Sequence, residues 1–376
     1  MDTSIDSFRT FQEDLDFLTA QGDVQLLRAP SGGVVAVSAR YQGRVMTSAV
    51  SPDGVSAGYV NRAFIEAGET GTQFDNFGGE DRFWLGPEGG QYGIYFPPGA
   101  AFTLDTWQVP QEMQTGTWEV TAQSDTSVTF HWSMAVVNYS GTTYDMEVER
   151  TVRLLNADEA ETYFGQRIPA GAEYVAFESV NRVTNVGADA WMPESGQPSI
   201  WILCMYPPLG TSWVAVPFAG PTSDDVIASY FGDIPPDRLE IREGYALFKA
   251  DGAYRSKIGV APANARPILG SFSPAAELLT LVQFDLPEDA SRYVNSQWEI
   301  QNQPYAGDVV NSYNDGPPGA GGFYEMESSS PALGLAPGDV YTHRHRTLHI
   351  TGNRDLLDEL ARDALGTTAS EMEAGI

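Results

Sequence analysis

The sequence predicts a mainly β protein built from stacked antiparallel sheets with a few peripheral helices. Short apolar runs separated by turn residues recur along its 376 residues, which include 38 glycines and 24 prolines, and this pattern is typical of β-rich folds. Many of these runs alternate apolar and polar side chains, as strands of antiparallel sheets do. Because no linker, charge block or internal repeat divides the chain, we expect one domain over residues 1–376.

The chain is expected to begin and end with a helix. Apolar residues recur at helical spacing within residues 1–20, at Phe8, Phe11, Leu15 and Leu18. A closing helix is expected over residues 353–370, where leucines recur after a possible N-cap at Asn353. These helices would lie at the periphery of the sheets.

Strands are expected over most of the remaining chain. Residues 32–50 read as two strands around a turn at Gln42-Gly43. Residues 71–100 are rich in glycine and aromatic side chains and read as a long structured loop. The other predicted strands lie over residues 115–155 (three or four strands), 174–187, 199–206, 277–286, 296–303, 321–330 and 339–350.

The net charge of the chain argues against two classes of binding partner. The net charge is −29, from 21 basic and 50 acidic residues, whereas nucleic acids and anionic membrane surfaces require a positive footprint. We therefore expect neither a nucleic-acid partner nor a membrane. The N-terminal stretch has no basic segment followed by an apolar one, so we expect a soluble protein that is cytoplasmic or the mature form of an exported one.

The sequence lacks the motifs of several well-known catalytic and nucleotide-binding sites. Walker-type phosphate loops, dinucleotide fingerprints, HExxH and GxSxG motifs are all missing. Cys204 is the only cysteine and lies in the apolar run SIWILCMY. No disulfide can form within the chain, and we expect a buried structural thiol.

The segment FDNFGGEDRFWLGPEGGQYGIYFPPG, residues 74–99, is a first candidate for function. It combines a glycine-rich backbone with Arg82, Trp84 and Glu88. Aromatic faces stack on sugar rings, while carboxylates and guanidinium groups bind hydroxyls, so the mixture suits a carbohydrate cleft. The alternative is a packed loop in which arginine and glutamate pair with each other.

Two acidic residues near the C-terminus form a second candidate. On a strand, Glu325 and Glu327 share one face. Two neighbouring carboxylates repel unless one is protonated, bound to a cation or paired with arginine. The pair therefore indicates a functional site, unless one member faces solvent at the strand end.

The final predicted strand, YTHRHRTLHI, holds three of the four histidines. Period-two alternation places one set of its side chains on one face, namely Tyr341, His343, His345, Thr347 and His349. Histidines at i and i+2 of a strand can act as acids and bases or present two nitrogens to one metal ion.

Two of these segments carry a family resemblance. FGGEDRFWLGPEGGQ, followed by EMESSSPALGLAPGDVYTHRHRTLHI, resembles the galactose mutarotase-like superfamily, and most closely a bacterial subgroup of unassigned function. The resemblance implies a β-supersandwich with a concave sugar-binding face. It also implies a glutamate on a late strand as general base, where Glu325 and Glu327 stand, and a histidine as acid. No mid-chain segment matches the histidine motif, and His131 is the only mid-chain histidine.

Three functions remain open at this point. The first is a sugar epimerase or mutarotase-like enzyme without a cofactor, whose catalytic groups are Glu325, Glu327 and a histidine, His343 or His131, and whose partner is a mono-, oligo- or polysaccharide. We expect His343 to face the cleft beside the two glutamates and His349 to lie at the periphery. The candidates for substrate binding are Arg82, Trp84, Glu88, Tyr144, Gln297, Asn311 and Tyr313.

The other two functions use the same segments differently. A metal-assisted polysaccharide lyase or glycoside-processing enzyme acting on uronate-containing sugars would hold a divalent metal with His343, His345, Glu325 and Glu327. A non-catalytic carbohydrate-binding protein would need only aromatic surfaces such as those of Trp84, Trp107 and Trp298.

Overall fold

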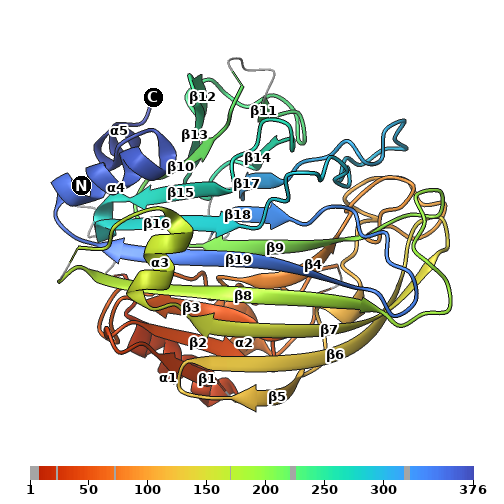
Figure 1. Cartoon of the computed structure of the whole chain (residues 1–376), viewed down its shortest axis with the longest axis horizontal. Helices are drawn as coiled ribbons and strands as arrows, with labels where there is room; N and C mark the ends of the chain where they lie inside the picture. Colours follow the sequence, from red (N-terminus) through yellow and green to blue (C-terminus); the bar gives the residue numbers. More distant parts are fainter. Residues whose placement is uncertain (1–7, 23, 72, 170, 221–225, 317–321) are drawn as a thin grey trace.

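Three antiparallel sheets make up most of the protein (Figure 1). The computed structural model describes residues 8–376 apart from residues 23, 72, 170, 221–225 and 317–321. The largest sheet has the strand order β12-β13-β10-β15-β16-β19-β8-β7-β6-β5. Its strands are β5 (Glu119–Gln123), β6 (Ser127–Val137), β7 (Thr143–Leu154), β8 (Glu173–Asn185), β10 (Ser212–Pro217), β12 (Leu239–Arg242), β13 (Tyr245–Ala250), β15 (Ile268–Ser273), β16 (Leu278–Phe284) and β19 (Val340–Thr351).

A second sheet packs against the large one, and a third, small sheet is formed near the N-terminus. The second sheet has the order β11-β14-β17-β18-β9-β4, and the small sheet has the order β1-β2-β3. The strands of both are β1 (Gln25–Arg28), β2 (Val34–Ser38), β3 (Arg44–Ala49), β4 (Arg82–Gly86), β9 (Ser199–Tyr206), β11 (Val226–Ile227), β14 (Ser256–Val260), β17 (Val310–Asn314) and β18 (Tyr324–Ser329). The predicted class, stacked antiparallel sheets with few helices, is confirmed.

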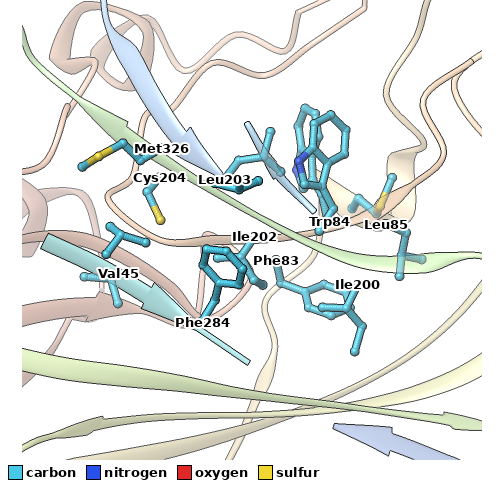
Figure 2. Close-up of a cluster of buried hydrophobic side chains, with 14 of the residues drawn as sticks. Val45, Phe83, Trp84, Leu85, Ile200, Ile202, Leu203, Cys204, Phe284 and Met326 are labelled. Atoms are coloured by element: carbon cyan, nitrogen blue, oxygen red, sulfur yellow. The ribbon is translucent and has the colours of Figure 1, made fainter. Parts of the chain in front are cut away.

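The main hydrophobic core lies between the sheets and draws side chains from all three. Figure 2 shows part of it, where Phe83 of β4 and Ile202 of β9 lie near Phe284 of β16. Successive side chains of strand β18 point alternately toward this core and away from it. Its Tyr324 hydroxyl lies 2.8 Å from the Ser271 hydroxyl of the large sheet, so the neighbouring odd-numbered side chains of β18 point to the opposite side.

Helices cover the outer face of the large sheet and flank the small one. They are α1 (Phe11–Gln21), α2 (Arg62–Ala67), α3 (Ala157–Phe164), α4 (Arg354–Leu365) and α5 (Ala369–Ala374), with short 3-10 turns at η1 (Gln111–Met113) and η3 (Pro274–Ala276). Leucines of α4 pack on Leu348 and Ile350 of β19 in a second buried cluster. Within the part of the chain described, no helix combines the length and apolar character needed to cross a bilayer.

Both predicted terminal helices are found, with different bounds. Helix α1 starts only after Thr10, whose hydroxyl accepts from the Glu13 backbone while the Glu13 carboxylate accepts from the Thr10 backbone. Asn353 caps α4 as expected. The closing segment is divided in two because Gly366 adopts a φ of 78°, a left-handed conformation that ends a helix.

The strand predictions succeed at the Gln42-Gly43 turn, where both residues have φ near 60° (62° and 61°). They fail over residues 296–303, which form no strand. There the Gln301 side chain donates to the backbone carbonyls of Asn295 and Gln297 and holds the chain in a loop. Gln297 and Gln301 therefore do not share a strand face. The predicted loop over residues 71–100 contains β4.

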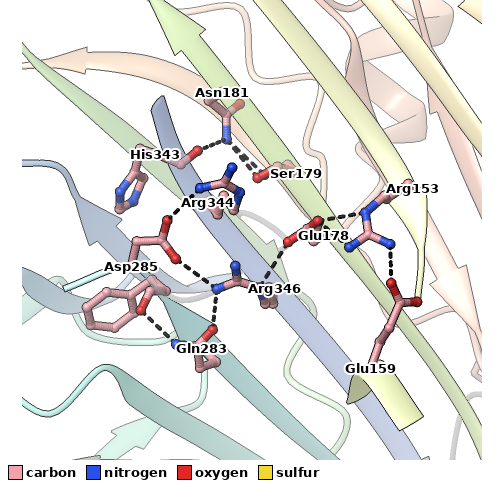
Figure 3. A network of polar contacts seen from close by, with 11 residues as sticks. Arg153, Glu159, Glu178, Ser179, Asn181, Gln283, Asp285, His343, Arg344 and Arg346 are labelled. Atoms are coloured by element: carbon pink, nitrogen blue, oxygen red, sulfur yellow. Dashed lines mark hydrogen bonds and ion pairs between the residues drawn. The ribbon is translucent and has the colours of Figure 1, made fainter. Parts of the chain in front are cut away.

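The two faces of β19 divide as the alternation predicts. His343, His345 and His349 are buried toward the core. Arg346 lies on the opposite face, where it contacts Glu178 at 2.9 Å and Asp285 at 3.0 Å (Figure 3). Its guanidinium also stacks over Tyr163 of α3, 4.1 Å from the ring centroid, and so links the helix to the sheet.

Candidate functional site

A cleft of about 310 Å³ lies on the side of the second sheet that faces away from the large sheet. Strands β4, β9, β14, β17 and β18 supply about half of its walls, and loops supply the other half. It is lined by Phe74, Asn76, Arg82, Trp84, Glu88, Leu104, Trp107, Trp201, Leu203, Met205, Phe231, Arg255, Lys257, Tyr313, Asp315, Gly316, Phe323, Glu325 and Glu327.

Glu325 points into this cleft from β18, and its Oε1 accepts a hydrogen bond from Arg82 Nη2 of β4. Both side chains are almost fully buried. Burial raises the pKa of the Glu325 carboxyl to about 8; the Arg82 charge opposes the shift, and the neighbouring Glu327 charge adds to it. A carboxyl group with this pKa can give and take a proton near neutral pH.

Glu327 lies two residues further along the same face and has a cation of its own. Its Oε2 accepts from Lys257 Nζ at 2.8 Å and from Trp201 Nε1 at 2.9 Å. The Lys257 ammonium also lies over the Trp201 ring, 4.8 Å from its centroid. The two carboxyl groups therefore share one cleft because each is matched by a different basic side chain.

Aromatic rings form much of the cleft wall. Trp84 packs edge-to-face on Trp201 and on Phe74, with ring centroids 6.0 and 5.5 Å apart. Trp107 donates its indole N–H to Glu88 Oε1 at 2.8 Å, and burial raises the pKa of Glu88. Arg82, Trp84 and Glu88, which the sequence singled out, thus meet in one place.

The remaining predicted binding residues are divided between the cleft and its surroundings. Tyr313 lines the cleft and donates to Asp315 Oδ1 at 3.0 Å. Asn311 pairs with Glu327 across β17 and β18, but its amide donates to Asp308 at 3.2 Å and the residue is not part of the cleft wall. Gln297 lines a neighbouring pocket of about 220 Å³, which shares Glu88 and Phe231 with the cleft.

His343 does not face the cleft, so that prediction is wrong. The Ser328 hydroxyl, on the core side of β18, lies 2.9 Å from His343 Nε2 and 2.9 Å from His345 Nδ1. Because neighbouring residues of a strand point to opposite faces, the histidines and the glutamates lie on different sides of β18. His349 is not peripheral either, since it is fully buried with Nε2 2.6 Å from Glu80.

His131 and Tyr144 also lie away from the cleft. His131 is partly exposed on β6, with its Nε2 4.0 Å from Glu147. Tyr144 is buried in β7, and its hydroxyl accepts from the Asn138 amide at 2.8 Å. Both strands belong to the large sheet, and the cleft lies beyond the second one.

The four donors expected for a metal, His343, His345, Glu325 and Glu327, cannot surround one ion because β18 separates them. A different trio, Asp81, Cys204 and His345, has donor atoms within 4.8 Å of one another. Asp81 is already paired with Arg150 at 2.5 Å, and this fixed positive charge opposes a second cation. Cys204 is buried, as predicted, and burial raises its pKa.

The buried histidines make stability depend on pH. Burial lowers the pKa of His343 to about 3 and that of His345 to about 4, while unfolded histidine titrates near 6.5. Between these values the unfolded chain binds more protons than the folded one. The free energy of unfolding is therefore expected to fall as the pH is lowered from about 6.5 to 4, by ~1.4 kcal/mol per pH unit for each histidine.

Urea unfolding at several pH values measures this slope. His343→Asn and His345→Asn should each lower the slope by about the contribution of one histidine. An unchanged slope in both buried variants would contradict the assignment.

The cleft residues that the sequence analysis did not single out include Trp201, Arg255 and Lys257. Lys257 had a usable signal, because it is one of only two lysines in a chain of net charge −29. Trp201 lies in a continuous apolar run, where no period indicates which side chains face a cleft.

Comparison with known proteins agrees with this architecture. One solved structure, a "putative aldose 1-epimerase" from Escherichia coli K12, is 13% identical, with a TM-score of 0.52 over 87% of this chain and 98% of that one. The Slr1438 protein from Synechocystis sp. PCC 6803 is also 13% identical, with a TM-score of 0.53 over 88% of this chain and 96% of that one. This chain therefore has the fold of these two solved structures, in agreement with the fold that the family resemblance implied.

The chain belongs to the family of unknown function DUF6786, whose sequence profile matches residues 9–376. No curated protein sequence matches it significantly.

Proposed function

We propose that the protein is a carbohydrate-active enzyme of the epimerase or mutarotase type, with Glu325 and Glu327 as its acid-base pair. The observation that carries the proposal is the pairing of these carboxyl groups on the cleft face of β18, each with its own cation. Aromatic rings around them supply surfaces on which sugar rings stack. The E. coli structure of the same fold, named as a "putative aldose 1-epimerase", is consistent with this class.

The raised pKa of Glu325 suggests how the two groups divide the work. Glu325, protonated near neutral pH, donates its proton to the ring oxygen of a bound aldose. Glu327 accepts the proton of the anomeric hydroxyl as the bond between the anomeric carbon and the ring oxygen breaks. The open aldehyde then rotates and closes by the reverse transfers, which restores both carboxyl groups.

Unpartnered polar atoms in the cleft support a polar ligand. Among the described residues, Arg82 Nε and Nη1, Trp84 Nε1 and Glu327 Oε1 are buried without a hydrogen-bond partner. Buried polar groups are nearly always satisfied, and all three side chains line the cleft. Sugar hydroxyls, which both donate and accept, match such a mixed set.

The test is exchange between anomers, followed by magnetization-transfer NMR on a panel of free aldoses and sugar acids. The proposal predicts saturable acceleration for at least one sugar. Binding of a sugar without exchange would reject the enzyme and favour a carbohydrate-binding protein, for which Trp84→Ala should weaken affinity.

The exchange rate is expected to depend on the protonation of Glu325. As a general acid it works only while protonated, and the protonated fraction falls tenfold per pH unit above its pKa. The second-order rate constant kcat/KM should therefore decline as the pH rises through about 8. A flat profile from pH 7 to 10 would contradict this role.

A further inference from the structure

Arg255 is a cleft residue with acidic side chains nearby but without a direct ion pair among the described residues. Its guanidinium lies 4.0 Å from the Phe231 ring centroid and 5.7 Å from that of Trp298. The other two basic side chains of the cleft, Arg82 and Lys257, each pair with a glutamate. Within the ranges that the structure describes, the Arg255 side chain forms no ion pair or hydrogen bond.

The nearby acidic side chains of the cleft are already engaged elsewhere. Asp315 accepts the Tyr313 hydroxyl at 3.0 Å, and Glu88 accepts the Trp107 indole at 2.8 Å. The chain has 50 acidic and 21 basic residues. A half-buried arginine without a carboxylate at contact distance is therefore unexpected.

Stacking leaves the guanidinium able to bind an anion. An aromatic ring covers the flat face of the group, while its N–H donors lie in the plane and stay available at the edge. Two parallel N–H groups match the geometry of a carboxylate or a phosphate. Neutral sugar hydroxyls would give the guanidinium no charged partner at contact distance.

We propose that Arg255 binds an anionic substituent of the sugar, so that the substrates are acidic sugars, either uronates or sugar phosphates, and not neutral ones. The inference rests on the proposed function, which places a sugar in this cleft. Arg255 then selects the substrate, while the two glutamates act on the ring.

The experiment compares matched ligands on the purified full-length protein by calorimetry. The ligands are glucose, glucuronate and glucose 6-phosphate, and the corresponding galactose series. We expect at least one acidic sugar to bind more tightly than its neutral parent. Arg255→Gln should lower the affinity for that acidic sugar by about tenfold or more. It should change the affinity for the neutral parent by less than about twofold.

Two further variants keep the result interpretable. Arg292→Gln removes another arginine stacked on an aromatic ring, 4.4 Å from the Tyr305 centroid but outside the cleft, and should change no affinity. Arg255→Lys keeps the charge without the planar fork and should retain part of the preference. If Arg255→Gln lowers the affinity for uronates alone, the group bound by Arg255 is a carboxylate. If it lowers the affinity for sugar phosphates alone, that group is a phosphate.

Three outcomes would overturn the inference: equal or tighter binding of the neutral parents, equal weakening of both ligand types by Arg255→Gln, or no binding of any acidic sugar. Anomer exchange separates this inference from the proposed function. Exchange of neutral sugars without an acidic preference rejects only the role of Arg255. Selective binding of acidic sugars without any exchange rejects only the enzyme.

Discussion

Glu325→Gln is expected to lower the rate of anomer exchange by about 10²–10⁴-fold, the usual range for loss of a general acid or base. The amide has nearly the shape of the carboxyl group and can still accept from Arg82, so the guanidinium keeps this hydrogen bond. It cannot donate the carboxyl proton. The measurement is kcat/KM for the best sugar of the panel, with thermal unfolding to verify that the variant folds.

Glu149→Gln is the matched control. Glu149 is also a strand glutamate near an arginine, Arg182 at 3.7 Å, but the pair is exposed on the large sheet. Its replacement should leave exchange unchanged. If Glu325→Gln kept full activity while Glu149→Gln behaved the same, Glu325 would have no part in proton transfer.

Arg150→Met is expected to lower the free energy of unfolding by about 3–5 kcal/mol, because it leaves a buried carboxylate without its partner. Arg150 and Asp81 are fully buried and 2.5 Å apart. The guanidinium also donates to the Gly43 carbonyl at 2.9 Å and to Asn181. It thereby joins the large sheet to the β2–β3 turn and the start of β4.

Urea denaturation compares this variant with Arg182→Met, which breaks an exposed pair on the same sheet and should cost about 0–1 kcal/mol. Adding Asp81→Asn to Arg150→Met should recover part of the lost stability, since the buried carboxylate that lacks its partner is then removed. Similar costs for the two arginines would contradict the role given to the buried pair.

The strands that could be predicted from the sequence have a recognisable turn, alternating faces or, in β9, a long uninterrupted apolar run. The Gln42-Gly43 turn, the alternation in β6 and β7, and the two faces of β19 were all visible. By contrast, β10 and β14 are buried along their whole length. Strands of this kind show no polar-apolar period, which is why the region from 207 to 276 gave no strand prediction.

The candidate site was predictable where one short segment supplies several of its residues. Arg82, Trp84 and Glu88 come from one motif, and Glu325 and Glu327 from another. The sequence could not show which side of the sandwich the histidines of β19 face. That depends on which sheet β19 joins and on which side of it the second sheet packs, and neither follows from local alternation.

Strand β18 serves two surfaces at once, and this has a consequence for how such a protein can evolve. Its odd-numbered residues hold the acids of the cleft, while its even-numbered residues, such as Ser328, bond to the core. Losing or gaining a single codon within it would reverse every side chain beyond that point and turn carboxylates toward the histidines. Substitution at odd positions leaves the core contacts in place. The cleft can therefore acquire new specificities through point changes, while the length of the strand must stay fixed.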